Sequence, residues 1–341
     1  MFNSRKYVLN VAQQIKPSME YANVSLNEWR KSAKEKLSEL LGMDQMITCS
    51  ADFTIQNKEI KDGYTQYDFT YQSEPDYYVP CSLLVPENAK KPLPVAICLQ
   101  GHSSGMHISL GIAKYPNDEE TIAGGRDFAI RAVKEGFCAI AMEQRYMGVC
   151  GGREDGNPAC MGKAENASMG ALLLGRTPIG ERVWDISRLI DLIESDLSEY
   201  VDPKHIICMG NSGGGTATFY ASCMDERIVL SMPSCAICTY EESIMAMNHC
   251  PCNYVPGIRK YFNMGDIGCL IAPRPLVLVC GVEDKIFPIN GVKTSFEIIK
   301  RAYRDAGKED LCSLVIGSAG HQFYPDDAWP VAKKYLEYLD K

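Results

Sequence analysis

The chain has 341 residues, 46% of them apolar, so it can bury a large core as one domain or as one domain with elaborations. Its formal net charge is −8 and no basic block is present, which argues against a nucleic-acid partner, because phosphate binding needs grouped Lys and Arg side chains. No apolar run has the length of a secretory signal or a membrane span, so we expect no membrane partner and a cytoplasmic location. Fifteen cysteines, an odd number, fit reduced thiols better than a disulfide framework.

Residues 1–46 predict a helical extension. The stretch SLNE places Ser25 as an N-cap and Glu28 three residues later, the spacing of a capping box. Apolar residues then recur on one helical face at Trp29, Ala33, Leu37, Leu40 and Leu41. We therefore expect this helix to pack against a larger body.

The remainder, residues 47–341, predicts an α/β catalytic domain. Extended runs rich in Thr, Tyr, Phe and Val, with a turn at KDG, predict antiparallel strands up to Pro86. From Leu93 onward short apolar runs alternate with helical segments, which is typical of a parallel sheet covered on both faces. The expected strands are LPVAICLQ, FCAIAME, HIICMG, RIVLSM, PLVLVCG and LCSLVIG. The fold class is thus α/β, with a mostly parallel central sheet, helices on both faces and antiparallel strands at the N-terminal edge.

Two stretches match G-x-S-x-G, the turn that presents a catalytic serine: GHSSG at Gly101 and GNSGG at Gly210. GNSGG follows the strand HIICM and precedes a run of small residues suited to a tightly packed helix, which is the context the motif requires. GHSSG is followed by a segment with Gly and Pro and no helical start. Ser212 is therefore the expected nucleophile, and Ser103 is a loop or pocket residue.

Two further motifs follow later strands: GVEDKIFP after PLVLVCG, and GHQF after LCSLVIG. With GNSGG they resemble the α/β-hydrolases of the dienelactone hydrolase and acetyl xylan esterase-like group, from about Val79 to the C-terminus. The resemblance implies the α/β-hydrolase fold and the chain order nucleophile, acid, histidine. Dienelactone hydrolases proper use a cysteine nucleophile, so the serine here favours ordinary ester substrates.

The resemblance also implies roles for individual residues. Ser212 is the nucleophile, His321 the general base, and Asp284 the carboxylate that orients the histidine; Glu283 is the weaker candidate for that acid. The N–H groups of Gly213 and His102 are the expected oxyanion donors. The second assignment departs from the family pattern, because many relatives have His-Gly where this chain has Gln100-Gly101.

Candidate pocket residues come from three segments. The loop at GHSSG contributes Gly101 and Ser103, and His107 follows it. Glu143 and Arg145 lie after FCAIAM, where a structural ion pair is favoured over contact with a polar substrate. A lid-like insertion at about 238–264 contributes His249 and Tyr254.

Four cysteines lie in or just before this insertion and, with His249, are candidates for zinc: Cys235, Cys238, Cys250 and Cys252. The spacing C-x2-C followed by C-x-C is irregular, and the first two thiols fall near the end of a strand. We therefore expect no metal and no cofactor.

Together these patterns predict a serine carboxylic-ester hydrolase that works through an acyl-enzyme. By resemblance, the expected partner is a small-molecule ester of the carbohydrate kind, and the expected reaction is deacetylation of a sugar or xylo-oligosaccharide. Hydrolysis of other small esters or amides, peptidase-like activity, a zinc-dependent enzyme and a non-catalytic binding protein on this fold stay open as alternatives. The sequence leaves the oligomeric state undetermined.

Overall fold

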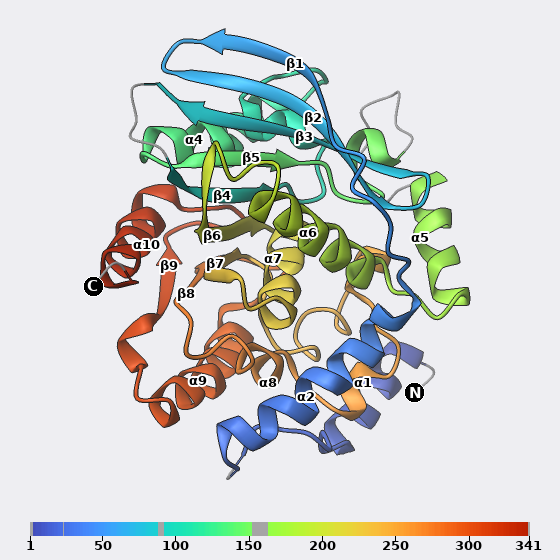
Figure 1. The fold of residues 1–341 in the computed structure, drawn as a ribbon. Helices are drawn as coiled ribbons and strands as arrows, with labels where there is room; N and C mark the ends of the chain where they lie inside the picture. Colours follow the sequence, from blue (N-terminus) through green and yellow to red (C-terminus); the bar gives the residue numbers. More distant parts are fainter. Residues whose placement is uncertain (1–2, 23, 88–91, 152–162, 340–341) are drawn as a thin grey trace.

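A computed structural model describes residues 3–22, 24–87, 92–151 and 163–339. Within these residues a nine-stranded sheet crosses the molecule in the order β1-β2-β3-β5-β4-β6-β7-β8-β9 (Figure 1). The strands are β1 (Thr54–Lys61), β2 (Tyr64–Glu74), β3 (Tyr77–Pro86), β4 (Leu93–Leu99), β5 (Cys138–Met142), β6 (Val201–Asn211), β7 (Ile228–Ser234), β8 (Leu276–Gly281) and β9 (Cys312–Gly317).

The sheet has an antiparallel part and a parallel part. Strands β1, β2 and β3 pair antiparallel and join the rest through the antiparallel β3–β5 pair. From β5 to β9 all neighbours are parallel. Every residue of β5 and β8 is buried, as expected for strands covered on both faces. The mostly parallel sheet with antiparallel N-terminal strands is confirmed.

Helices cover both faces of this sheet (Figure 1). Helices α6, α7 and α9 lie on one face and α4 and α10 on the other, as right-handed crossovers require for this strand order. The helices are α1 (Ser4–Gln14), α2 (Leu26–Leu41), α3 (Asp118–Thr121), α4 (Phe128–Lys134), α5 (Lys163–Leu173), α6 (Pro178–Glu194), α7 (Gly213–Met224), α8 (Met264–Gly268), α9 (Ile289–Asp305) and α10 (Pro325–Leu339). None of these helices is both long enough and apolar enough to span a membrane.

Helix α2 packs outside α6 and α7 (Figure 1). Trp29 and Leu37 are buried and belong to the same hydrophobic cluster as the central strands. The expected capping box does not form: Ser25 occupies the N-cap position, but its side chain makes no capping hydrogen bond. Ser25 and Glu28 are both exposed, so water can satisfy the first N–H groups of the helix.

The carboxyl ends of β4 to β9 lie at one edge of the sheet, because these strands are parallel. The loops that follow them carry the candidate site residues. GHSSG follows β4, Glu143 follows β5, Ser212 follows β6, Asp284 follows β8 and His321 follows β9. As expected, GHSSG does not lead into an α-helix; a 3₁₀ turn, η2 (Met106–Leu110), comes next.

Candidate active site

Ser212 lies at a sharp corner between β6 and α7. Its backbone has φ 57° and ψ −122°, a strained conformation for a residue with a side chain. Such a conformation costs on the order of 1–3 kcal/mol and persists only where its surroundings impose it. The Ser212 N–H donates to the carbonyl of Ser234 at 2.9 Å, and α7 begins at the next residue. This is the geometry of a serine held out from the backbone at the start of a helix.

Glycines are needed around Ser212 because the backbone of β4 and of the loop after it lies very close to the turn between β6 and α7. A Cβ on Gly214 would lie 2.0 Å from the carbonyl oxygen of Leu99, inside β4. A Cβ on Gly101 would lie 2.7 Å from the Asn211 carbonyl oxygen and 3.0 Å from the Ser212 Cβ. The backbone of GHSSG therefore packs directly against the turn that carries Ser212.

Asp284 and His321 form a hydrogen-bonded pair. The Nδ1 of His321 donates to the Oδ2 of Asp284 at 2.8 Å, and the carboxylate is fully buried. Its other oxygen accepts the N–H groups of Ile286 at 2.8 Å and Phe287 at 3.1 Å. Burial opposes the charge, but the hydrogen bond from His321 and the two N–H groups outweigh it and lower the pKa of Asp284. The carboxylate therefore stays ionised and fixes the tautomer of the histidine.

The opposite nitrogen of His321 is directed away from Asp284 and is available for proton transfer. Among the described residues, Nε2 is buried and has no hydrogen-bond partner. The ring stacks on Phe287 with centroids 5.9 Å apart and an interplanar angle of 14°, which fixes its orientation. Nε2 therefore makes no hydrogen bond to Ser212 in this structure; catalytic hydrogen bonds are often long without substrate and tighten in the complex.

Ser234, at the end of β7, connects the two halves of the site. Its carbonyl accepts the Ser212 N–H, and its hydroxyl donates to the side-chain oxygen of Asn211 at 2.8 Å. The same hydroxyl reaches the carbonyl of Gln322, next to His321, at 3.5 Å. The sequence analysis missed Ser234, although its position at the carboxyl end of a parallel strand was a usable signal.

Glu283, the alternative acid, points elsewhere. Its side chain is exposed, whereas Asp284 is buried against the histidine. The structure therefore brings His321 together with Asp284 and not with Glu283.

His102 lies beside Gly213, the first residue of α7. A Cβ on Gly213 would meet the His102 ring at 2.7 Å from Cε1 and 2.9 Å from Nδ1. The N–H groups of a helix's first turn have no partner within the helix, so the Gly213 N–H is free of helical bonding. The structure thus brings together the two residues expected to form the oxyanion hole.

Ser103 is engaged within its own loop. Its N–H donates to the Gly101 carbonyl at 2.8 Å, and its hydroxyl lies 3.5 Å from the same oxygen. His107 is buried, and its Nε2 lies 2.8 Å from Asp118. Ser103 thus stays within its loop, and His107 braces the loop through Asp118.

Glu143 and Arg145 do not form the ion pair that the sequence suggested. Arg145 is buried and pairs with Asp185 at 2.6 Å and Glu74 at 2.7 Å, and its guanidinium lies over the ring of Tyr77. These partners lie on other elements, so Arg145 is a structural cross-link between β2, the loop after β5 and α6.

Glu143 instead supports the loop that follows GHSSG. Its carboxylate accepts the N–H groups of Met106 at 3.2 Å and Val149 at 3.4 Å. Burial raises the pKa of Glu143 to about 7, although these N–H groups oppose the shift. No contact in the described structure directs this carboxylate toward Ser212.

The segment between β7 and α8 places His249 near His321 and Tyr254 away from it. The His249 ring lies 5.6 Å from the ring of Phe287, which stacks on His321. Burial, followed by the charges of His102 and His321, lowers the pKa of His249 to about 4. Tyr254 is 41% exposed and lines an apolar groove of about 240 Å³ against α1, so it is not the wall of the active site that we expected.

The four candidate zinc cysteines do not form one site. The Cys235 Sγ lies 3.3 Å from the Gln322 carbonyl, and the Cys238 Sγ lies 3.6 Å from the Pro288 carbonyl. Cys250 and Cys252 instead lie together with His102. The four cysteines therefore lie in three separate surroundings and cannot bind one zinc ion together.

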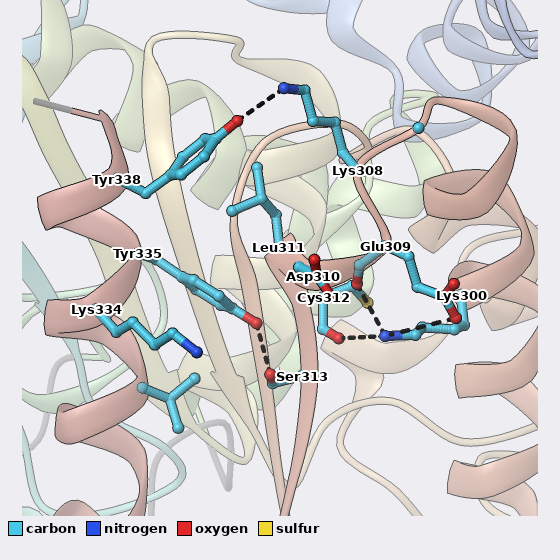
Figure 2. Close-up of a pocket in the computed structure, with 12 residues that line it drawn as sticks. Lys300, Lys308, Glu309, Asp310, Leu311, Cys312, Ser313, Lys334, Tyr335 and Tyr338 are labelled. Atoms are coloured by element: carbon cyan, nitrogen blue, oxygen red, sulfur yellow. Dashed lines mark hydrogen bonds and ion pairs between the residues drawn. The ribbon is translucent and has the colours of Figure 1, made fainter. Parts of the chain in front are cut away.

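A cavity of about 690 Å³ lies far from this chemistry (Figure 2). Figure 2 shows Lys300, Lys308 and Lys334 around it, with Tyr335 and Tyr338 of α10. Its lining includes Cys312 and Ser313, at the amino end of β9, whereas His321 follows the carboxyl end of that strand. The cavity is thus at the opposite edge of the sheet from Ser212.

The fold and the Ser–Asp–His arrangement at the strand ends define the class of α/β-hydrolases. Residues 2–315 match the model of the abhydrolase family, and the chain belongs to that family. A chain named "Putative hydrolase YtaP", from Bacillus subtilis (strain 168), is 30% identical over 164 residues, which is 47% of this chain. The match spans 54%, about half, of the length of that curated relative.

Solved structures show the same fold at lower identity. A "putative acetyl xylan esterase" from Bacteroides fragilis NCTC 9343 superposes with a TM-score of 0.77 at 17% identity, covering 99% of this chain and 95% of that one. A glucuronoyl esterase from Solibacter usitatus superposes with a TM-score of 0.65 at 14% identity, covering 95% of this chain and 96% of that one. At this identity the likeness establishes the fold, which agrees with the resemblance inferred from the motifs.

Proposed function

We propose that the chain is a serine carboxylic-ester hydrolase that acts through an acyl-enzyme. The observation that carries the proposal is the hydrogen-bonded His321–Asp284 pair, which follows strands of the same sheet edge as Ser212, the strained residue directly before α7. A serine hydroxyl needs such a base to become nucleophilic at neutral pH. The esterases among the solved structures with this fold support the same reaction class.

In the first half-reaction the Ser212 Oγ attacks the ester carbonyl carbon while His321 Nε2 accepts the hydroxyl proton. The carbonyl oxygen becomes an oxyanion, stabilised by the N–H groups of Gly213 and His102. The intermediate then breaks its bond to the alcohol oxygen, which takes the proton from His321. The products are free alcohol and acyl-Ser212.

In the second half-reaction water attacks the acyl carbon and gives its proton to His321. The tetrahedral intermediate breaks its bond to Ser212 Oγ, which recovers the proton from the histidine. The carboxylic acid leaves, and the enzyme returns to its starting state. Throughout, Asp284 holds Nδ1–H and stabilises the imidazolium that forms twice per cycle.

As the substrate we propose an acetylated sugar or xylo-oligosaccharide. The support is the structural likeness to a chain named as an acetyl xylan esterase and the serine nucleophile. We place the protein in the cytoplasm, because fifteen cysteines, an odd number scattered along the chain, fit the reduced thiols of a reducing compartment better than a disulfide framework. There it would act on imported fragments and not on polymer.

The test compares wild type with Ser212→Ala on acetylated xylo-oligosaccharides, on p-nitrophenyl esters of increasing acyl length, on a glucuronate ester and on peptide amides. We expect ester turnover in the wild type and a loss on the order of 10⁴-fold or more in the variant. A fluorophosphonate should label wild-type Ser212 stoichiometrically. Full activity in Ser212→Ala, or no labelling of native protein, would overturn the assignment; the ester panel decides the acyl and alcohol groups.

A further inference from the structure

Three side chains that can bind metal ions meet beside the proposed active site. His102 comes from the loop after β4, and Cys250 and Cys252 come from the segment between β7 and α8. The imidazole nitrogen and the two sulfurs all lie within 4.8 Å of one another. The Nε2 of His102 is 3.3 Å from the Cys252 Sγ. These residues are about 150 positions apart in the chain, so only the fold brings them together.

This arrangement has the chemistry and the dimensions of a zinc site. Thiolate sulfur and imidazole nitrogen are the preferred zinc ligands. With bonds of about 2.0 Å to nitrogen and about 2.3 Å to sulfur, tetrahedral ligand atoms lie about 3.5–3.8 Å apart. The observed separations therefore need only small side-chain rotations to bind one ion.

Packing fixes the ligands on both sides. The Cε1 and Nδ1 edge of the His102 ring lies against Gly213, which directs Nε2 toward Cys252. Cys252 is buried within the short 3₁₀ helix η5 (Pro251–Asn253), which packs against α6 and α7. Asn253 of that helix accepts the hydroxyl of Thr216 at 3.2 Å. The positions of His102 and Cys252 are thus held by contacts that do not depend on the metal.

We propose that His102, Cys250 and Cys252 bind one zinc ion, which ties the β7–α8 segment to the loop after β4. As the ion binds, each thiol releases its proton to solvent and its sulfur becomes a thiolate ligand, so the two thiolates balance the charge of the cation. Three protein ligands leave a fourth position for water or another ligand. In this site the His102 ring is a metal ligand, and the ion would hold in place the loop whose His102 N–H is the proposed oxyanion donor. That consequence for the oxyanion hole rests on the proposed function, whereas metal binding itself does not.

Metal analysis of the purified full-length protein tests the site directly. We expect about one equivalent of zinc per chain in the wild type and loss of most of it in Cys252→Ser and in Cys250→Ser/Cys252→Ser. Cys49→Ser is the matched control, since Cys49 is a partly buried thiol that lies 3.7 Å from the Gln72 carbonyl of β2 and outside the cluster. It should keep the metal.

Cobalt titration of chelator-treated wild type gives a second readout that does not depend on any variant folding. We expect a thiolate-to-cobalt charge-transfer band and, in the visible range, the intense absorption of tetrahedral cobalt. Both should disappear when added zinc displaces the cobalt. Absence of both metal and cobalt band overturns the proposal. So does metal retained in the folded double variant, or a disulfide between Cys250 and Cys252 in the native protein. Since none of these readouts measures ester turnover, failure of the metal site and failure of the proposed function are distinguishable.

Discussion

At the scale of single residues, the two G-x-S-x-G turns have different surroundings. Ser212 starts a helix in strained geometry, whereas Ser103 bonds back to the carbonyl of Gly101 in its own loop. The value of Gly101 is that its missing side chain lets the loop backbone approach Ser212. The turn that carries Ser212 therefore packs against the backbone of this loop and not against its hydroxyl groups.

We expect Ser103→Ala to reduce kcat/KM for a p-nitrophenyl ester by less than about tenfold, equivalent to about 1.4 kcal/mol. The reason is that its side chain contributes only a long contact within the loop. Steady-state kinetics of Ser103→Ala beside Ser212→Ala measure the contrast. Equal losses in the two variants would mean that the roles of the two serines have been misassigned.

Glu143 makes a prediction about pH. Its pKa is about 7 in the folded protein, above its ordinary value of 4.5, so the folded state binds the proton more tightly than the unfolded chain. The contribution of Glu143 to the free energy of unfolding is therefore fully present below about pH 4.5. It is lost as pH rises toward 7, which lowers the free energy of unfolding by on the order of 3 kcal/mol.

In Glu143→Gln this loss should disappear, because the amide oxygen can still accept the N–H of Met106 without carrying a charge. Urea denaturation of both proteins between pH 4.5 and 8 provides the measurement. The variant should gain stability relative to wild type as pH rises. A difference between the two proteins that does not change with pH would show that Glu143 does not titrate in this range.

At the scale of elements, the contact between β4 and the start of α7 decides whether the corner at Ser212 can form. A methyl group on Gly214 would lie 2.0 Å from the Leu99 carbonyl, which is fixed in the central strand and cannot retreat. We expect Gly214→Ala to lower the free energy of unfolding by about 3 kcal/mol or more and to abolish turnover.

The matched control is Gly170→Ala in the interior of α5. A Cβ at Gly170 would meet nothing within 4 Å, so alanine should stabilise the protein by about 0.5–1 kcal/mol through lower chain entropy. Thermal and urea denaturation compare both variants with wild type. If Gly214→Ala were as stable as Gly170→Ala, the close packing of β4 on α7 would be incorrect.

At the scale of the whole molecule, helix α2 shares the hydrophobic cluster of the central sheet. Leu37 is fully buried where α2 meets α6 and α7. We expect Leu37→Ala to destabilise the protein by about 2–5 kcal/mol, through lost burial and the cavity left behind. Leu173→Ala, at a side chain that is 89% exposed, should change stability by less than about 0.5 kcal/mol. Urea unfolding tests both, and equal effects would show that α2 is not part of the cooperative core.

The sequence could predict the sheet and the triad candidates because each depends on local patterns. Apolar runs of strand length specify buried strands, and a glycine motif directly after a strand marks a loop at its carboxyl end. Ser212, Asp284 and His321 each carry such a signature within a few residues. The expected capping box was wrong because both of its side chains are exposed, where water competes for the same N–H groups.

By itself, then, the sequence determined the α/β class, the strand order in the chain and the order Ser212, Asp284, His321. Only the tertiary structure decided that Arg145 pairs with Glu74 and Asp185, and that His102 meets Cys250 and Cys252. The physical reason is the separation of the interacting residues along the chain. Periodicity and turn motifs act over a few residues, whereas these contacts join side chains from about 40 to 150 positions apart, and nothing near either partner specifies the other.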